Sequence, residues 1–314
     1  QALEVAARFA ERQGRRDQMP GIVDDWAGRS LSKFTPGKSD ELNDQATVQA
    51  LGVLAAAGSS LQRLGFVEES VPWFERAYRE FPTQALGPYI VALGQVDKLE
   101  DAVRICAEHY AKYQDAQSAT LLVEVLLNFK DSETQASLIS ANKDPLDDAS
   151  KRFEDNAAFL EGLGTLKMAE GEYDQAAECF VNALKVNPES VRALNNLAMS
   201  YAEIPERASE GLGPINTALR LTNQNPELLD TKGVVLMASG RLAEAEATFA
   251  EAFAASREPR HLFHVILAQV VQEKESQAAR NWRDLDLDKL DPTGLTASER
   301  ATLKELKAKF ESAS

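Results

Sequence analysis

The chain has 314 residues, of which 44 % are hydrophobic, and its 17 glycines and 12 prolines are spread thinly, which predicts a helical globular protein. The formal net charge of −15 at pH 7 argues against binding to nucleic acid or to an anionic membrane surface, since both need an excess of Lys and Arg. No run of about 18 apolar residues is present, so we expect no membrane insertion. Cys106 and Cys179 are too few for a disulfide framework and are expected to be small buried hydrophobic residues.

Residues 1–50 predict one degenerate helical unit followed by a loop. Small and apolar residues recur there at helical spacing, namely Leu3, Ala7, Ala10, Gly14 and Val23. A loop around residues 34–43 is expected to separate this unit from the next.

Residues 51–150 predict one clear helical pair and two degenerate ones. In the clear pair, residues 51–84, Gly65 marks the turn between two apolar helical faces. Residues 86–113 and 116–141 have the spacing of two further helical pairs without the same residue pattern. The Asp-Pro dipeptide within residues 142–148 predicts a loop.

Residues 157–190 contain the most regular pair. Gly171 and Glu172 interrupt the apolar pattern, which indicates a tight turn between two helices, and Pro188 ends the second helix. The pattern of this pair is formed by Leu160, Leu163, Gly164, Ala176, Phe180, Ala183 and Pro188. These residues resemble the tetratricopeptide repeat in all but its first-helix aromatics, whose places are taken by Leu160 and Lys167.

Two ladders of small residues extend this unit over residues 151–283, where we expect four such repeats. Neighbours within each ladder lie 34 or 35 residues apart, a period typical of solenoids. The ladders consist of Gly164, Ala198, Gly233 and Ala268, and of Ala176, Gly211, Ala245 and Ala279. The second repeat departs from the pattern through a turn at 204–206 that is one residue longer. The resemblance implies an all-α fold, a right-handed superhelical solenoid of antiparallel helix pairs.

Residues 284–314 predict a linker and a C-terminal capping helix. Leu285, Leu287 and Leu290 are interpreted as a strip that docks on the last helices. Thr296 and Glu299 have the spacing of a capping box in front of a polar helix over residues 297–310.

No motif in the sequence supports catalysis, a metal or a cofactor. His261 and His264 could share a metal ion, but a site needs three or four ligands, and His264 occupies a slot for a buried first-helix aromatic. The acidic run from Asp284 to Asp288 imitates a calcium loop but has Lys289 and Leu295 where Gly and Glu are required.

In the tetratricopeptide family the first helices of successive repeats line a concave groove, so their non-core positions are the predicted partner-binding residues. These positions hold Glu161, Thr165, Asn195, Asn196, Met199, Glu203, Asp230, Val234 and Met237. The methionines among them could equally belong to the core. Chaperone-binding family members hold a C-terminal carboxylate with Lys, Asn and Arg; the five corresponding slots here are Glu161, Thr165, Asn196, Glu227 and Thr231, of which only Asn196 fits.

The sequence therefore predicts a non-catalytic scaffold that binds a basic or apolar segment of a protein or peptide in this groove. A self-assembling structural module, with the chain as a homo-oligomer, is the alternative, followed by an enzyme or metal protein. Runs at 194–198 and 229–233 resemble repeat arrays of large bacterial proteins. The chain begins at Gln1 without a leader, so we expect a fragment or processed form whose parent continues upstream with more repeats. The compartment stays open, with the cytoplasm favoured.

Overall fold

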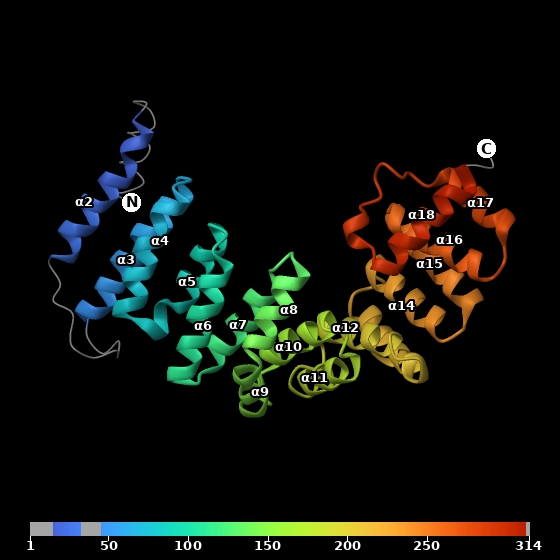
Figure 1. The fold of residues 1–314 in the computed structure, drawn as a ribbon, viewed down its shortest axis with the longest axis horizontal. Helices are drawn as coiled ribbons and strands as arrows, with labels where there is room; N and C mark the ends of the chain where they lie inside the picture. The colour runs from blue at the N-terminus through green and yellow to red at the C-terminus, as the bar shows by residue number, and fades with distance from the viewer. Residues whose placement is uncertain (1–14, 33–44, 312–314) are drawn as a thin grey trace. The chain divides into compact units, whose positions relative to one another are not determined.

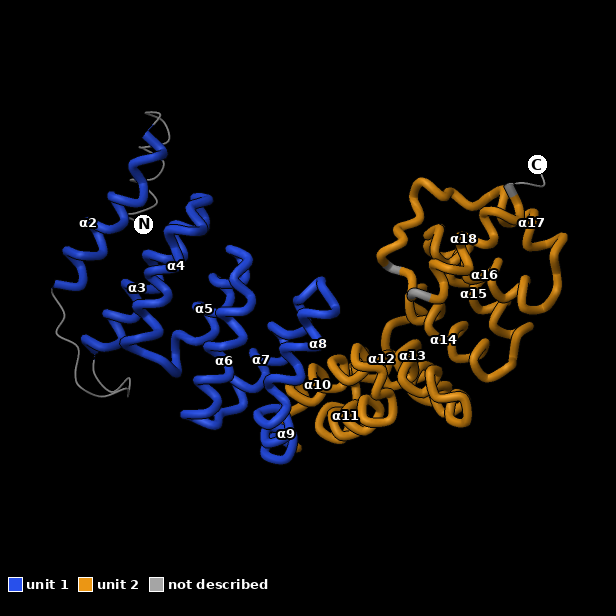
Figure 2. The backbone as a smooth tube through the Cα atoms, viewed as in Figure 1, with its two compact units in different colours: residues 1–153 blue, residues 154–314 orange. Residues whose placement is uncertain are grey.

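The computed structural model describes residues 15–32 and 45–311. The chain divides into two compact units, residues 1–153 and residues 154–314 (Figure 2). Every regular element within the described ranges is a helix, which confirms the predicted all-α class. The predicted helical positions from Leu3 to Gly14, and the predicted loop at 34–43, lie outside the described residues.

Unit 1 is a row of helices in which each helix packs against the next in the sequence (Figure 1). Its elements are η1 (Arg16–Gln18), α2 (Met19–Leu31), α3 (Gln45–Arg63), α4 (Val67–Glu80), α5 (Pro82–Gln95), α6 (Leu99–Tyr113), α7 (Ala116–Leu127), α8 (Ser132–Ala141) and α9 (Lys143–Arg152). The helical pairs predicted over 86–113 and 116–141 correspond to α5 with α6 and to α7 with α8.

Unit 2 contains the regular repeats and the C-terminal cap. Its elements are α10 (Ala157–Ala169), α11 (Tyr173–Val186), α12 (Val191–Ala202), η2 (Pro205–Gly211), α13 (Leu212–Leu221), α14 (Pro226–Ala238), α15 (Leu242–Ser256), α16 (Pro259–Val271), α17 (Glu275–Asp284), η3 (Pro292–Gly294) and α18 (Ala297–Glu311). The first helices of successive repeats, α10, α12, α14 and α16, pack against one another in that order.

Local sequence signals fix where these helices begin and turn. Asn156 and Ser190 cap the starts of α10 and α12, each accepting a hydrogen bond from a backbone N–H in the first helical turn. At the turns between paired helices, Gly171 has φ 78° and Gly240 has φ 73°, a conformation that strains any residue with a Cβ atom. The predicted turn at Gly171 is confirmed.

The glycines of the first ladder are small because aromatic rings lie against them. Each ring comes from the second helix of a pair, and each glycine lies on the first helix. A Cβ atom on Gly164 would lie 2.8 Å from the Phe180 ring, and one on Gly233 would lie closer still to the Phe249 ring. In the second repeat the large residue is Ile215, and Ala198 takes the ladder position in the same core cluster. The period in the sequence is therefore a period of close helix–helix contact.

The predicted loop at 142–148 is wrong, because α8 passes into α9 at Asn142. The Asn142 carbonyl accepts a hydrogen bond from the Leu146 N–H and so starts α9. Pro145 lies in the first helical turn, where a backbone N–H needs no partner, so the Asp-Pro dipeptide does not interrupt helix.

The longer turn predicted at 204–206 is the start of the seven-residue 3-10 helix η2. It ends at Gly211, where a Cβ atom would lie 2.9 Å from the Ala198 carbonyl oxygen. This contact explains why glycine replaces the alanine that the other repeats have at this position.

The C-terminal segment packs as predicted. Leu285 and Leu290 are buried in the core of the last repeats, and Leu287 packs against that core. Thr296 and Glu299 form the predicted capping box, since each side chain accepts a hydrogen bond from the backbone N–H of the other residue. Leu306 then anchors α18 on the core of α16 and α17. None of the helices in the described ranges is long and apolar enough to cross a bilayer.

Candidate functional site

The predicted partner-binding residues lie on three neighbouring helices of unit 2, and we refer to them as the first-helix face. They are Glu161 and Thr165 on α10; Asn195, Asn196 and Met199 on α12; Glu203 at the end of α12; and Asp230, Val234 and Met237 on α14. Residues three, four or seven apart share one side of a helix, and α12 packs against both α10 and α14. The face is thus continuous within unit 2.

The acidic member of the face on α10 is already paired within the chain. Glu161 is buried, and its carboxylate accepts hydrogen bonds from the Ser190 hydroxyl at 2.6 Å and from the Arg192 guanidinium at 2.6 Å. Both partners stand at the start of α12, in the next repeat. Glu161 therefore links two repeats, and its negative charge is neutralised by Arg192.

Uncharged amides occupy the middle of the face. The Asn196 side chain donates to the Thr165 hydroxyl at 3.4 Å, and Asn195 donates to the Asn196 carbonyl oxygen at 3.2 Å. The Asn195 Oδ1 atom is buried and has no hydrogen-bond partner in the structure. A buried amide oxygen without a partner is costly, so a rotation of the Asn195 side chain that brings this atom to a ligand donor would relieve that cost.

A buried charge cluster joins the face to the C-terminal cap. The His264 ring contacts Asp230 through Nδ1 at 2.6 Å and lies 3.2 Å from Glu299 through Nε2. Burial by itself lowers the pKa of His264, but the two neighbouring carboxylates outweigh burial and raise it to about 9. Burial likewise raises the pKa of Glu299, but the His264 and Thr296 contacts outweigh it and lower that pKa to about 2. His264 is consequently charged at neutral pH.

A second ion pair runs beside this cluster. Arg260 on α16 pairs with Glu227 on α14, and its Nε lies 4.0 Å from Asp230. The predicted buried packing of His264 is confirmed, since the residue is 5 % exposed and its ring centroid lies 5.2 Å from that of Phe249. Within the described part of the chain, no group of three or more His, Cys, Asp or Glu residues is placed to hold a metal ion.

The remaining members of the face are three apolar side chains and one carboxylate. Val234 and Met237 are half-buried and pack against the core of the last repeats, and Met199 is half-buried on α12. Glu203 is exposed, and no ion pair or hydrogen bond involves its side chain among the described residues. It is the carboxylate of the face whose charge stays available.

Sequence reasoning found the helices of this face but missed the partners of its acids. Arg192, Arg260 and His264 lie 31 to 34 residues after the acids that they contact, close to one repeat length. An acid and a base separated by nearly one period were therefore a usable signal. The His264 contact with Glu299 carries no such signal, because α18 lies outside the repeats.

The comparisons with known proteins agree with this repeat geometry. A family model described as tetratricopeptide repeat matches residues 88–230. Residues 88–230, which are 143 of the 314 residues, are thus similar to the tetratricopeptide repeat family. The matched region covers the degenerate pairs of unit 1 as well as the first repeats of unit 2. No curated protein matches the chain in sequence.

Solved structures, a tetratricopeptide repeat protein among them, share the fold of the chain. A tetratricopeptide repeat protein from Parabacteroides merdae is 15 % identical with a TM-score of 0.56, over 81 % of this chain and 98 % of that one. The Cut9–Hcn1 hetero-tetramer of APC/C gives 14 % identity and a TM-score of 0.50, over 82 % of this chain and 47 % of that one. At these identities the likeness establishes the fold alone.

Proposed function

We propose that this protein is a non-catalytic scaffold whose first-helix face binds a segment of another protein. The observation that carries the proposal is the amide pair of Asn195 and Asn196, in which one buried carbonyl oxygen lacks a partner. Asparagine side chains offer both donors and acceptors, which suits them to the backbone of an extended peptide.

The charges of the face narrow the chemistry of the partner. Arg192 and His264 meet the charges of Glu161 and Asp230, so these two acids position the helices and do not attract a ligand. The half-buried Met199, Val234 and Met237 favour an apolar partner side chain. Glu203 favours a basic residue beside it and disfavours a carboxylate.

Affinity capture from the lysate of the source organism tests this proposal. The test variant carries Asn195→Ala, Asn196→Ala and Met199→Ala, which leave the buried acids intact. The control carries Glu178→Ala, Asn216→Ala and Glu251→Ala on second helices, and circular dichroism verifies equal helicity. We expect a partner that the parent and the control retain and the face variant loses. Equal retention by all three proteins would contradict the proposal, and recovery of the chain alone would favour the self-assembling module.

A further inference from the structure

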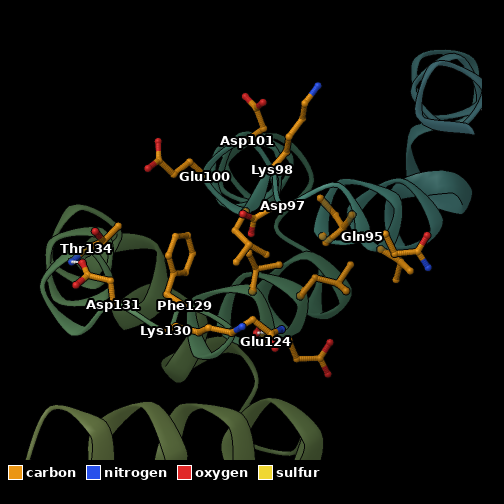
Figure 3. A pocket seen from close by; sticks show the side chains of 17 residues that line it. Gln95, Asp97, Lys98, Glu100, Asp101, Glu124, Phe129, Lys130, Asp131 and Thr134 are labelled. Atoms are coloured by element: carbon orange, nitrogen blue, oxygen red, sulfur yellow. Dashed lines mark hydrogen bonds between the residues drawn. The ribbon is translucent and has the colours of Figure 1, made fainter. Parts of the chain in front are cut away.

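Unit 1 contains an open pocket of about 990 Å³ that is separate from the first-helix face (Figure 3). It is lined by the last turns of α5 and α7 and by the first turns of α6 and α8. These are the turns inside the two degenerate repeats, where the sequence shows no repeat pattern. No residue of the first-helix face contributes to it.

Part of the pocket wall is formed by apolar side chains that are exposed or only half-buried. Val91 on α5 is 55 % exposed, one of the most exposed large hydrophobic residues in the described ranges. Phe129 is half-buried, and Figure 3 shows its ring standing between the start of α8, marked by Asp131, and the segment that carries Asp97. Exposed apolar area of this kind is stabilised when a partner covers it. The other apolar lining residues are Ile90, Leu99, Leu121 and Val125.

The charge of the pocket lining is negative. It contains five carboxylates, from Asp97, Glu100, Asp101, Glu124 and Asp131, and two ammonium groups, from Lys98 and Lys130.

Two of the carboxylates are occupied at helix starts. Asp131 accepts a hydrogen bond from the Thr134 N–H at the start of α8, and Asp101 in the first turn of α6 pairs with Arg104. For the side chains of Asp97, Glu100 and Glu124, the structure contains no hydrogen bond or ion pair with another described residue. Three carboxylates therefore remain available to a ligand.

We propose that this pocket binds a short segment of a partner protein in which a large apolar side chain is flanked by Lys or Arg. The apolar side chain covers Val91 and Phe129, and the flanking cations pair with Asp97, Glu100 and Glu124. An acidic segment would meet the excess of carboxylates and be repelled. The site shares no residue with the first-helix face, so it stands or falls independently of the proposed function.

The test is a phage-display selection of random dodecapeptides on the whole chain, followed by fluorescence anisotropy with each labelled peptide. One variant carries Asp97→Asn, Glu100→Gln and Glu124→Gln, and a second carries Val91→Gln. The control for the charge variant carries Glu178→Gln, Glu251→Gln and Glu305→Gln. The control for Val91→Gln is Val271→Gln, because Val271 is 56 % exposed.

We expect the selected peptides to carry an apolar residue between basic ones. Their dissociation constants should rise about tenfold in the charge-neutralised variant, because three exposed ion pairs are lost together, and should stay unchanged in its control. Val91→Gln should also weaken binding, and Val271→Gln should not. Acidic or uncharged peptides, no enriched peptides, or equal binding to all variants would overturn the proposal. Peptides lost only by the Asn195, Asn196 and Met199 variant would overturn it while supporting the proposed function.

Discussion

The first-helix face of unit 2 and the pocket of unit 1 both contain acidic side chains, but these side chains differ in burial and in whether they are paired. On the first-helix face of unit 2, Glu161 and Asp230 are buried and paired with bases from the next repeat. In the pocket of unit 1, Glu100 and Glu124 are exposed and have no such partners. The first-helix face thus uses Glu161 and Asp230 to join one repeat to the next, whereas the pocket leaves Glu100 and Glu124 available. A net charge of −15 does not by itself reveal which carboxylates can attract a basic partner.

Two of the three buried histidines, His109 in unit 1 and His264 in unit 2, show the same difference between single side chains. In unit 1, His109 contacts the Tyr78 hydroxyl at 3.2 Å and lies 3.3 Å from one carboxylate, that of Asp115, and burial lowers its pKa. In unit 2, His264 lies between two carboxylates, which outweigh burial. One carboxylate leaves a buried imidazole neutral here, and two carboxylates charge it.

The largest expected effect is a difference in stability loss between removing a paired acid, Asp230, and removing an unpaired one, Glu124. Asp230→Ala removes a partner of the buried, charged His264 and should lower the free energy of unfolding by about 3 kcal/mol. Glu124→Ala removes an exposed carboxylate and should change it by less than about 0.5 kcal/mol. Urea denaturation followed by circular dichroism measures both. Similar losses for the two variants would contradict the comparison.

The pH dependence of stability should have opposite signs in the two units. Because the pKa of His264 is raised from 6.5 to about 9, its contribution to unit 2 is complete below pH 6.5 and is lost as pH rises through 9. The loss amounts to about 3 kcal/mol. Because the pKa of His109 is lowered, unit 1 should instead lose stability as pH falls below 6.5.

Hydrogen exchange resolved by segment, with α16 compared to α6, distinguishes these trends. His264→Gln should abolish the alkaline loss in α16 and leave α6 unchanged. An alkaline loss that persists in this variant would rule out His264 as its source.

A smaller effect concerns glycine in regular and degenerate repeats. Gly233→Ala forces a methyl group into the Phe249 ring and should destabilise the protein by about 1–3 kcal/mol. At Gly94 in α5 a Cβ atom would make only an ordinary contact, with Leu99 Cδ2 at 3.9 Å, so Gly94→Ala should stabilise the protein by about 0.5–1 kcal/mol through helix propensity. Thermal unfolding of both variants measures this, and a stabilised Gly233→Ala protein would refute the close-contact explanation of the ladder.

The sequence predicted the repeats because their packing repeats. Gly164 and Gly233 each face a phenylalanine sixteen residues later, and that local geometry leaves a period in the sequence. It also predicted the cap, since Thr296 and Glu299 satisfy backbone groups of their own helix. Prediction failed at 142–148, because the Asp-Pro dipeptide is compatible both with a loop and with the first turn of a helix.

The chemistry of the two surfaces was harder to predict. The pairing of Glu161 with Arg192 depends on which rotamers meet across two repeats, and the Glu299 contact depends on how α18 folds back. The pocket lining comes from four helices of repeats that lack the sequence pattern, so no motif marks it. The positions on the face were predictable from period and helical spacing, but the charge available at each position was not.

Nitrogen-15 NMR of the histidine imidazoles in the whole chain at pH 7.5 tests the central claim most directly. That claim is that the two buried acids of the first-helix face, Glu161 and Asp230, are neutralised by bases within unit 2. We predict that both ring nitrogens of His264 are protonated and that His109 carries a single ring proton, with His264→Gln and His109→Gln assigning the signals. A neutral His264 at this pH would contradict the account, because Asp230 would then have only the more distant Arg260, at 4.0 Å, to offset its charge beside the proposed binding face.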